Sequence, residues 1–108
     1  MSYPDYASEK FGAGVLTLAE APGRIKERLL DAYLSQVMRA HPPDAGLSAE
    51  ITKRINDLDA RMTRVSEPAP NGTIAATVDA MTEEEASELA REIVELSWAI
   101  DHERHGVR

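Results

Sequence analysis

Apolar residues recur three and four positions apart through most of the 108-residue chain, and clusters of proline and glycine separate these runs. Such spacing gathers apolar side chains on one face of a helix. It predicts helices over residues 8–20, 24–40, 48–65 and 81–106. Residues 73–80 also suit a strand, but we favour a short helix there because no second strand is available to pair with it. Because neither half of the chain has enough apolar surface to fold alone, we expect a single all-α domain over 1–108, a small bundle of four to five helices. Residues 1–7 are expected to form an irregular arm, and residues 66–72, with two prolines and an Asn-Gly pair, a loop.

The last of these helices is the most clearly marked. Thr82 and Glu85 match the T-x-x-E capping box, in which each side chain accepts a hydrogen bond from the backbone of the other residue. Gly106 suits the left-handed position that follows a helix. Spacings of four, three and four draw a single apolar stripe, made of Leu89, Ile93, Leu96 and Ile100. We expect this stripe to pack into the core and the glutamate-rich remainder of the helix to face solvent.

The first two helices contain residues that need a packing explanation. Gly12 and Gly14 each weaken a helix over 8–20 by roughly 1 kcal/mol relative to alanine, unless the missing side chain lets a neighbour approach closely. Residues 24–40 carry a broad apolar face, which is typical of a central helix. Within that face, the hydroxyl of Tyr33 requires a hydrogen-bond partner if it is buried.

The third helix, over 48–65, is expected to begin at Ser48, a residue type that caps helices well. Its apolar seam is made of Ile51, Ile55, Leu58, Met62 and Val65, a pattern that favours packing along another helix. Two pairs of opposite charges four residues apart are expected to form weak ion pairs within this helix: Glu50 with Arg54, and Asp57 with Arg61.

Charge is distributed unevenly along the chain. The net charge is −7, and residues 1–65 contribute nothing to it, with nine basic and nine acidic side chains, whereas residues 66–108 carry three basic and ten acidic ones. This asymmetry argues against direct binding to nucleic acid, where affinity comes from basic side chains that displace counterions. It favours a protein partner with a basic surface. The alternative is that the glutamates only promote helix formation and solubility.

The candidate partner-binding residues lie on and just before the last helix. They are Asp79, Glu83, Glu84, Glu88, Glu92, Glu95 and Trp98. Trp98 continues a second apolar line through Ala90 and Val94, beside the stripe. It either fills the core, which is the usual place for the only tryptophan of a small helical domain, or lies at the border of the bundle and anchors an interface.

Chemistry-bearing motifs are missing from the sequence. There is no cysteine, which removes thiolate catalysis and cysteine-containing metal sites, and no nucleophile elbow, P-loop or dinucleotide motif occurs. His102 and His105 lie three residues apart near Asp101, but the H-E-x-x-H spacing and a third fixed ligand are missing, so we interpret both histidines as stabilising the end of the helix. We expect no enzyme activity, no cofactor and no metal site.

No apolar run reaches the roughly 18 residues that a membrane-spanning helix requires, and the N-terminal residues do not resemble a signal peptide. A cytoplasmic location without membrane attachment is expected.

Two stretches carry a resemblance to known proteins, Gly-Arg-Ile-Lys-Glu-Arg-Leu-Leu-Asp-Ala-Tyr-Leu over residues 23–34 and the run from Asn-Gly-Thr-Ile to Glu-Glu-Glu-Ala over residues 71–86. They resemble short, acidic, all-helical proteins of phages and other mobile elements, among them anti-CRISPR proteins that block type I surveillance complexes. The resemblance implies a non-enzymatic inhibitor that occupies a basic nucleic-acid-binding surface, with carboxylates where phosphates would lie. The balanced charge of residues 1–65 departs from a protein that mimics DNA over its whole surface, and leaves open a hydrophobic or wedge-like mode of inhibition.

A second hypothesis is a helical scaffold that forms homodimers or larger homo-oligomers. In this hypothesis Val94, Trp98 and the seam that starts at Ile51 bury each other between chains.

Overall fold

Helix α5 (Glu83–Arg104) is the central element, and three of the other helices pack on it. The computed structural model describes residues 3–40, 46–66 and 72–105. The remaining elements are α1 (Tyr3–Glu20), α2 (Ile25–Ser35), the short 3-10 helix η1 (Val37–Ala40), α3 (Ala49–Met62) and α4 (Thr73–Ala80). These residues contain five α-helices and no strand, which confirms the predicted all-α fold. None of the helices among them is both long and apolar enough to cross a bilayer.

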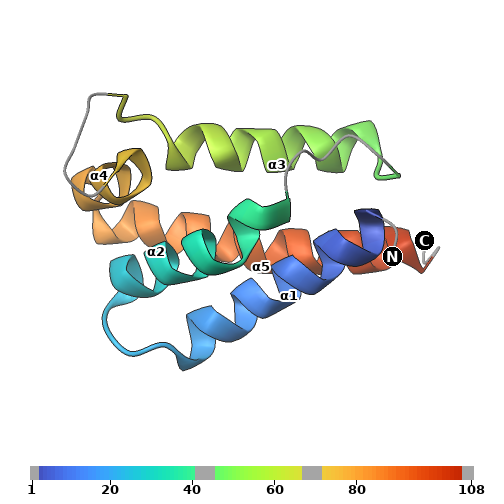
Figure 1. Cartoon of the computed structure of the whole chain (residues 1–108), viewed down its shortest axis with the longest axis horizontal. Coiled ribbons are helices and arrows are strands. Elements are labelled where there is room, and N and C mark those ends of the chain that lie inside the picture. The colour runs from blue at the N-terminus through green and yellow to red at the C-terminus, as the bar shows by residue number, and fades with distance from the viewer. Residues whose placement is uncertain (1–2, 41–45, 67–71, 106–108) are drawn as a thin grey trace.

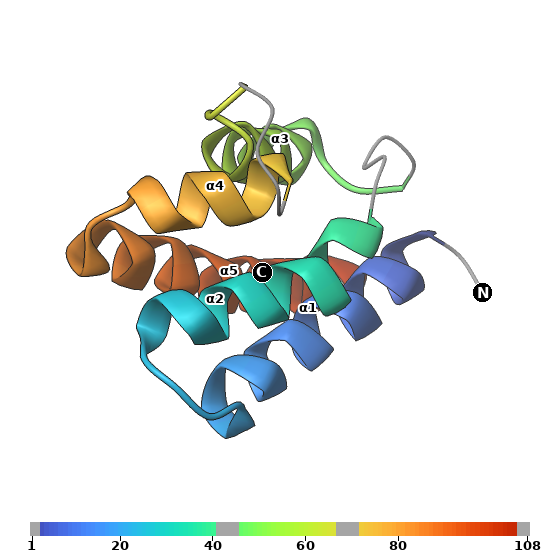
Figure 2. The same cartoon turned by 60° about the vertical axis from the view of Figure 1, so that its left-hand side comes forward.

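The helices surround α5 on three sides. Figure 1 shows α3 on one side of α5 and the pair α1 and α2 on the other, and Figure 2 shows α4 beside α3. Helix α1 runs antiparallel to α5, because Asp5 in the first turn of α1 lies 2.7 Å from Arg104 in the last turn of α5. One turn further on, the Ser8 hydroxyl donates to the Asp101 carboxylate.

The predicted stripe and seam both face this core. Leu89, Ile93, Leu96 and Ile100 of α5 are completely buried, as the spacing predicts. The seam of α3 is buried in the same core over Ile51, Ile55, Leu58 and Met62, whereas Val65 lies beyond the end of the helix at Met62 and is only half-buried. The scaffold hypothesis is therefore wrong in one respect, since the seam is already used within the chain and would have to leave its own core to contact another copy.

The capping residues begin the helices where the sequence places them. The Ser48 hydroxyl accepts a hydrogen bond from the Ile51 N–H at 3.2 Å, and the Thr82 hydroxyl accepts one from the Glu85 N–H at 3.0 Å. The reciprocal half of the predicted capping box is replaced, because the Glu85 carboxylate binds Arg64 instead. Gly106 and residues 67–71 of the expected loop lie outside the described residues.

Helix α1 begins earlier than expected. The structure makes residues 3–7 helical, so the irregular arm predicted over 1–7 is wrong there. Pro4 is tolerated in a first turn because the N–H that it lacks would have no partner in the helix. Asp5 is favoured by the positive end of the helix dipole, and Ala7 is completely buried. The arm is helical because these contacts with the core stabilise it, and they leave no periodic signal in so short a stretch.

The helix expected over 24–40 is interrupted after Ser35. Gln36 departs from helical geometry, with φ −129° and ψ −65°, and the chain continues as η1. The Ser35 hydroxyl donates to the carbonyl and to the carboxylate of Asp31, and the Ser35 carbonyl accepts from the Arg39 Nε at 2.9 Å. Side chains that bind backbone groups in this way compete with the helical hydrogen bonds and bend or end a helix.

Tyr33 is buried and finds the partner that its hydroxyl requires, since it donates to Asp59 Oδ1 at 2.6 Å. Burial raises the pKa of the Tyr33 phenol far above its ordinary value, and the hydrogen bond to Asp59 raises it further. The folded protein favours the neutral phenol of Tyr33, and this preference stabilises the fold. Because the phenol of the unfolded chain ionises near pH 10, the stabilisation is complete below that pH and is lost as the pH rises above it. We expect an alkaline titration of tyrosine absorbance to leave one of the three tyrosines protonated until the helices unfold. Ionisation of all three before loss of circular dichroism would contradict this burial.

Candidate partner-binding face

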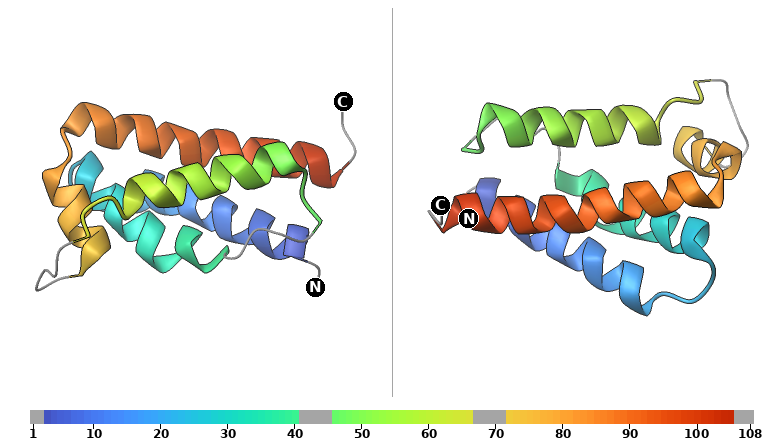
Figure 3. Two further views of the ribbon diagram at one scale, coloured as in Figure 1. Left: turned by 90° about the horizontal axis from the view of Figure 1, so that it is seen from above. Right: turned by 180° about the vertical axis from the view of Figure 1, so that it is seen from behind.

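One side of α5 has no other helix against it. Figure 3, in the view from behind, shows α5 crossing the front of the molecule with α3 above it and α1 below. The outer face of α5, as we call this surface, consists of exposed residues: Glu84, Ser87, Glu88, Arg91, Glu95, Trp98 and His102. These residues lie opposite the buried stripe because a helix turns by about 100° per residue.

Arginine side chains of α3 bind the glutamates at the edge of this face. Arg54 holds the Glu92 carboxylate with two hydrogen bonds, at 3.0 and 3.2 Å, and the hydrogen bond to Glu92 raises the pKa of the Arg54 guanidinium. The two ion pairs predicted within α3 do not form as expected. Arg54 pairs with α5 instead of Glu50, and the carboxylate of Asp57 pairs with Lys53 at 2.7 Å. Glu92 is therefore a contact between α3 and α5.

Two further arginines extend this contact toward the start of α5. Arg64 lies 2.6 Å from the Glu85 carboxylate, and this hydrogen bond lowers the pKa of Glu85 below its ordinary value. Arg61 lies 3.6 Å from Glu85 and 3.8 Å from Glu88. Glu88 is thus shared between this edge and the outer face, while Glu85 belongs to the contact between the helices.

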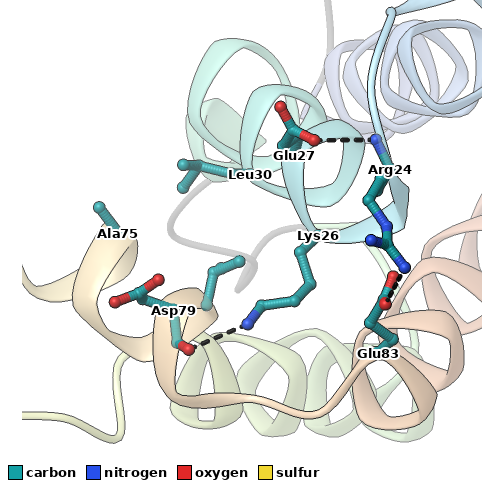
Figure 4. Close-up of a pocket in the computed structure, with 8 residues that line it drawn as sticks. Arg24, Lys26, Glu27, Leu30, Ala75, Asp79 and Glu83 are labelled. Carbon is teal, nitrogen blue, oxygen red and sulfur yellow. Dashed lines mark hydrogen bonds and ion pairs between the residues drawn. The ribbon is translucent and has the colours of Figure 1, made fainter.

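The first two predicted site residues, Asp79 and Glu83, lie elsewhere. They line a groove of about 370 Å³ between the start of α2 and the end of α4, as Figure 4 shows. In this groove Arg24 binds the Glu83 carboxylate at 2.6 Å, and Lys26 donates to the backbone carbonyl of Asp79 at 2.9 Å. Arg24, the residue before α2, therefore offsets the charge of Glu83, whereas Lys26 binds the backbone of Asp79, and the structure does not bring this groove together with the outer face of α5.

The carboxylates of Glu84 and Glu95 are different, since neither takes part in an ion pair or hydrogen bond within the described part of the chain, although Glu95 is near enough to Arg54 to help raise the pKa of its guanidinium. Together with Glu88 and Glu92 they line a shallow hollow of about 280 Å³ along α5. Arg91 is the basic side chain that lines the same hollow. Of the predicted set, the structure therefore places Glu84, Glu88, Glu95 and Trp98 together on one exposed face.

Trp98 is the largest apolar group on this face, with 63% of its surface exposed. The expectation that the only tryptophan fills the core is wrong. The second apolar line turns gradually away from the core, so that Ala90 is buried, Val94 is half-buried and Trp98 is exposed. The position of Trp98 two residues before the buried Ile100, on a helix with about 100° per residue, is the signal that identifies its outward direction.

The acidic residues and Arg104 near the end of α5 link this helix to its neighbours. The Glu103 carboxylate accepts a hydrogen bond from the Ser48 N–H at 2.6 Å, and Asp101 and Arg104 bind α1. His102 and His105 are exposed. Within residues 3–40, 46–66 and 72–105, no three side chains of the metal-binding types are close enough to hold an ion.

Sequence reasoning missed the arginines that bind this helix from α3. Arg54 and Arg61 are seven residues apart and therefore share one side of α3, which is a usable signal once α3 and α5 are known to be neighbours.

Comparisons of the sequence with protein-family models and with curated proteins, and of the structure with solved structures, find no match.

Proposed function

We propose that this chain is a non-enzymatic binding protein that inhibits a nucleic-acid-handling complex of a host cell by covering a basic surface of that complex. The observation that carries the proposal is the outer face of α5, where Glu84 and Glu95 have no ion-pair partner in the described residues and lie on the same side as Trp98. Glu88, 3.8 Å from Arg61, adds a third carboxylate that is only loosely held.

The chemistry of this face suits a basic protein surface better than a small substrate. Carboxylates that form no internal ion pair attract arginine and lysine side chains over a distance and guide association. An exposed tryptophan beside them supplies a large apolar contact, which is the kind of residue that dominates binding energy at interfaces. The hollow on this face is shallow and lined by charges, whereas pockets for small molecules are enclosed and mostly apolar.

The resemblance of residues 23–34 and 71–86 to anti-CRISPR proteins supports a more specific form of the proposal, in which the target is a type I surveillance complex. In this form the carboxylates of α5 occupy sites that otherwise hold DNA phosphates, and the protein acts in the cytoplasm without a cofactor.

The first experiment identifies the target. It is a pull-down from extracts that contain candidate complexes, with washes at low and high salt and mass spectrometry of the retained proteins.

The decisive test compares two triple variants. Lysine at positions 84, 88 and 95 reverses the charge of the outer face (Glu84→Lys, Glu88→Lys and Glu95→Lys), and we expect it to weaken inhibition on the order of 100-fold, because juxtaposed like charges cost several kcal/mol. The measurement is binding of labelled target DNA to a purified type I surveillance complex over a range of protein and salt concentrations. For the unchanged protein, inhibition should weaken as the salt concentration rises.

The matched control places the same three lysines on exposed acidic residues of other surfaces, namely Glu9, Glu20 and Glu50. This variant has the same net charge as the first, so an effect of overall charge would appear equally in both. We expect the control to inhibit as the unchanged protein does. Equal inhibition by both variants, with the helical circular dichroism of each intact, would remove the outer face of α5 from the proposal.

A further inference from the structure

We propose that the outer face of α5 is also an interface for a second copy of this chain, with the two α5 helices packed antiparallel about a two-fold axis. This inference does not rest on the proposed function, since it concerns the purified protein alone. It follows from the order of the charged and aromatic residues along the face, which makes the face complementary to itself.

The two ends of the outer face differ in composition, because its first turns carry carboxylates and its last turns carry an aromatic ring and a histidine, with Glu95 between Arg91 and Trp98. Glu84 and Glu88 lie in the first turns, Arg91 in the middle, and Trp98 and His102 further on. The exposed His105 follows directly after the helix as its C-terminal cap. A face of this kind meets unlike groups when it pairs antiparallel with its copy, and like groups when it pairs parallel.

The register of the antiparallel pair follows from the sequence positions. Arg91 precedes Val94 by three residues and Trp98 follows Glu95 by three, so a two-fold axis between Val94 and Glu95 places each Arg91 against the Trp98 ring of the other copy. A guanidinium over a tryptophan ring is a favourable cation–π contact, and the pair would occur twice in the dimer.

The ends of the face match about the same axis. Glu84 precedes Val94 by ten residues and His105 follows Glu95 by ten, so each Glu84 meets the His105 of the other copy. Glu88 comes within one turn of His102 of that copy. Near the axis, Glu95 lies one turn from Arg91 of the other copy, which offsets the approach of the two Glu95 carboxylates. The antiparallel helix dipoles add to this attraction.

The chain leaves room for such a contact. Helices α1 and α3 flank α5, and the view from behind in Figure 3 shows no other helix over the outer face. Trp98 is 63% exposed and Val94 half-buried, so the pair would remove both tryptophans from water.

The mass of the purified protein in solution tests the proposal. A single helix face buries less area than a standard interface, so we expect dissociation constants on the order of 100 μM and a mass that rises from 11.8 kDa toward twice that value as the concentration approaches about 1 mM. Sedimentation equilibrium measures this directly. A mass of 11.8 kDa over the whole concentration range would overturn the proposal.

Trp98→Ala should weaken self-association on the order of 30-fold, as expected for an aromatic anchor. Leu34→Ala is the control, because Leu34 is an exposed apolar residue of α2 at a different surface and should leave the dissociation constant unchanged. Self-association that is equally strong in Trp98→Ala would overturn the proposed interface.

A charge exchange tests the antiparallel register itself. His105→Glu places two glutamates opposite each other at both ends of the dimer, and we expect about a fivefold weaker association. Adding Glu84→Lys to this variant gives the two positions opposite charges and should return the dissociation constant to that of the unchanged protein or below. Failure of the second change to rescue the first would overturn the register, and neither variant alters a buried residue.

Discussion

Replacing Phe11 with alanine is expected to lower the free energy of unfolding by about 3–5 kcal/mol, the range observed when a buried aromatic residue is truncated to alanine. Phe11 is completely buried and belongs to the common core with the stripe of α5. Domains of this size have a total stability of about 5–15 kcal/mol, so the loss removes a large share of it. Chemical denaturation followed by far-UV circular dichroism measures the change.

Leu16→Ala provides the control for this substitution. Leu16 lies on the same helix, but 57% of its surface is exposed, so its truncation leaves no cavity. We expect a change within about 0.5 kcal/mol. A loss for Phe11→Ala as small as that expected for Leu16→Ala would mean that α1 does not contribute Phe11 to the core, and would contradict the packing of α1 on α5.

Features that depend on short-range spacing were predictable from the sequence. The stripe from Leu89 to Ile100 is buried because residues three and four apart share a helix face in any environment. The capping hydroxyls of Ser48 and Thr82 act within their own first turn, so their neighbours in sequence determine them. The all-α fold follows from these local signals.

Features that depend on contacts between helices were not predictable in this way. The helical start at Tyr3 depends on contacts of α1 with the end of α5, about a hundred residues away in sequence. Arg54 pairs with Glu92 across two helices, although Glu50 lies four residues away on its own helix. A periodic pattern identifies the face of a helix, but it does not identify the neighbour.

The candidate site shows the same division. Glu84, Glu88, Glu95 and Trp98 share a face because helical geometry alone places them there. Glu92 is excluded from this face because Arg54 of α3 binds it, Glu83 because Arg24 binds it in the groove, and Asp79 because it lies on α4. The proposed contact surface therefore contains fewer acidic residues than the sequence suggests, and substituting each remaining residue tests its part in binding.

The two neighbouring glycines of α1 are expected to respond to alanine in opposite directions. Gly12 is exposed and a Cβ atom there would meet nothing within 4 Å, so Gly12→Ala should raise the free energy of unfolding by about 1 kcal/mol through helix propensity alone. At Gly14, a Cβ atom would lie 2.7 Å from Val37 Cγ2 of η1, and 3.7 Å from Ile93 Cγ2 of α5. We expect Gly14→Ala to lower the free energy of unfolding by about 1–3 kcal/mol despite the same gain in propensity.

Urea denaturation of both variants measures these changes, and equal stabilisation by the two substitutions would mean that α1 and η1 do not approach as closely as the structure shows. A double substitution identifies the cause of the loss. Val37→Ala removes the methyl group that obstructs position 14, so the two substitutions together should cost less than the sum of their separate costs. Purely additive costs would place the strain elsewhere. Because Val37 follows the interruption at Gln36, this coupling would show that the change from α2 to η1 is what brings the chain against Gly14.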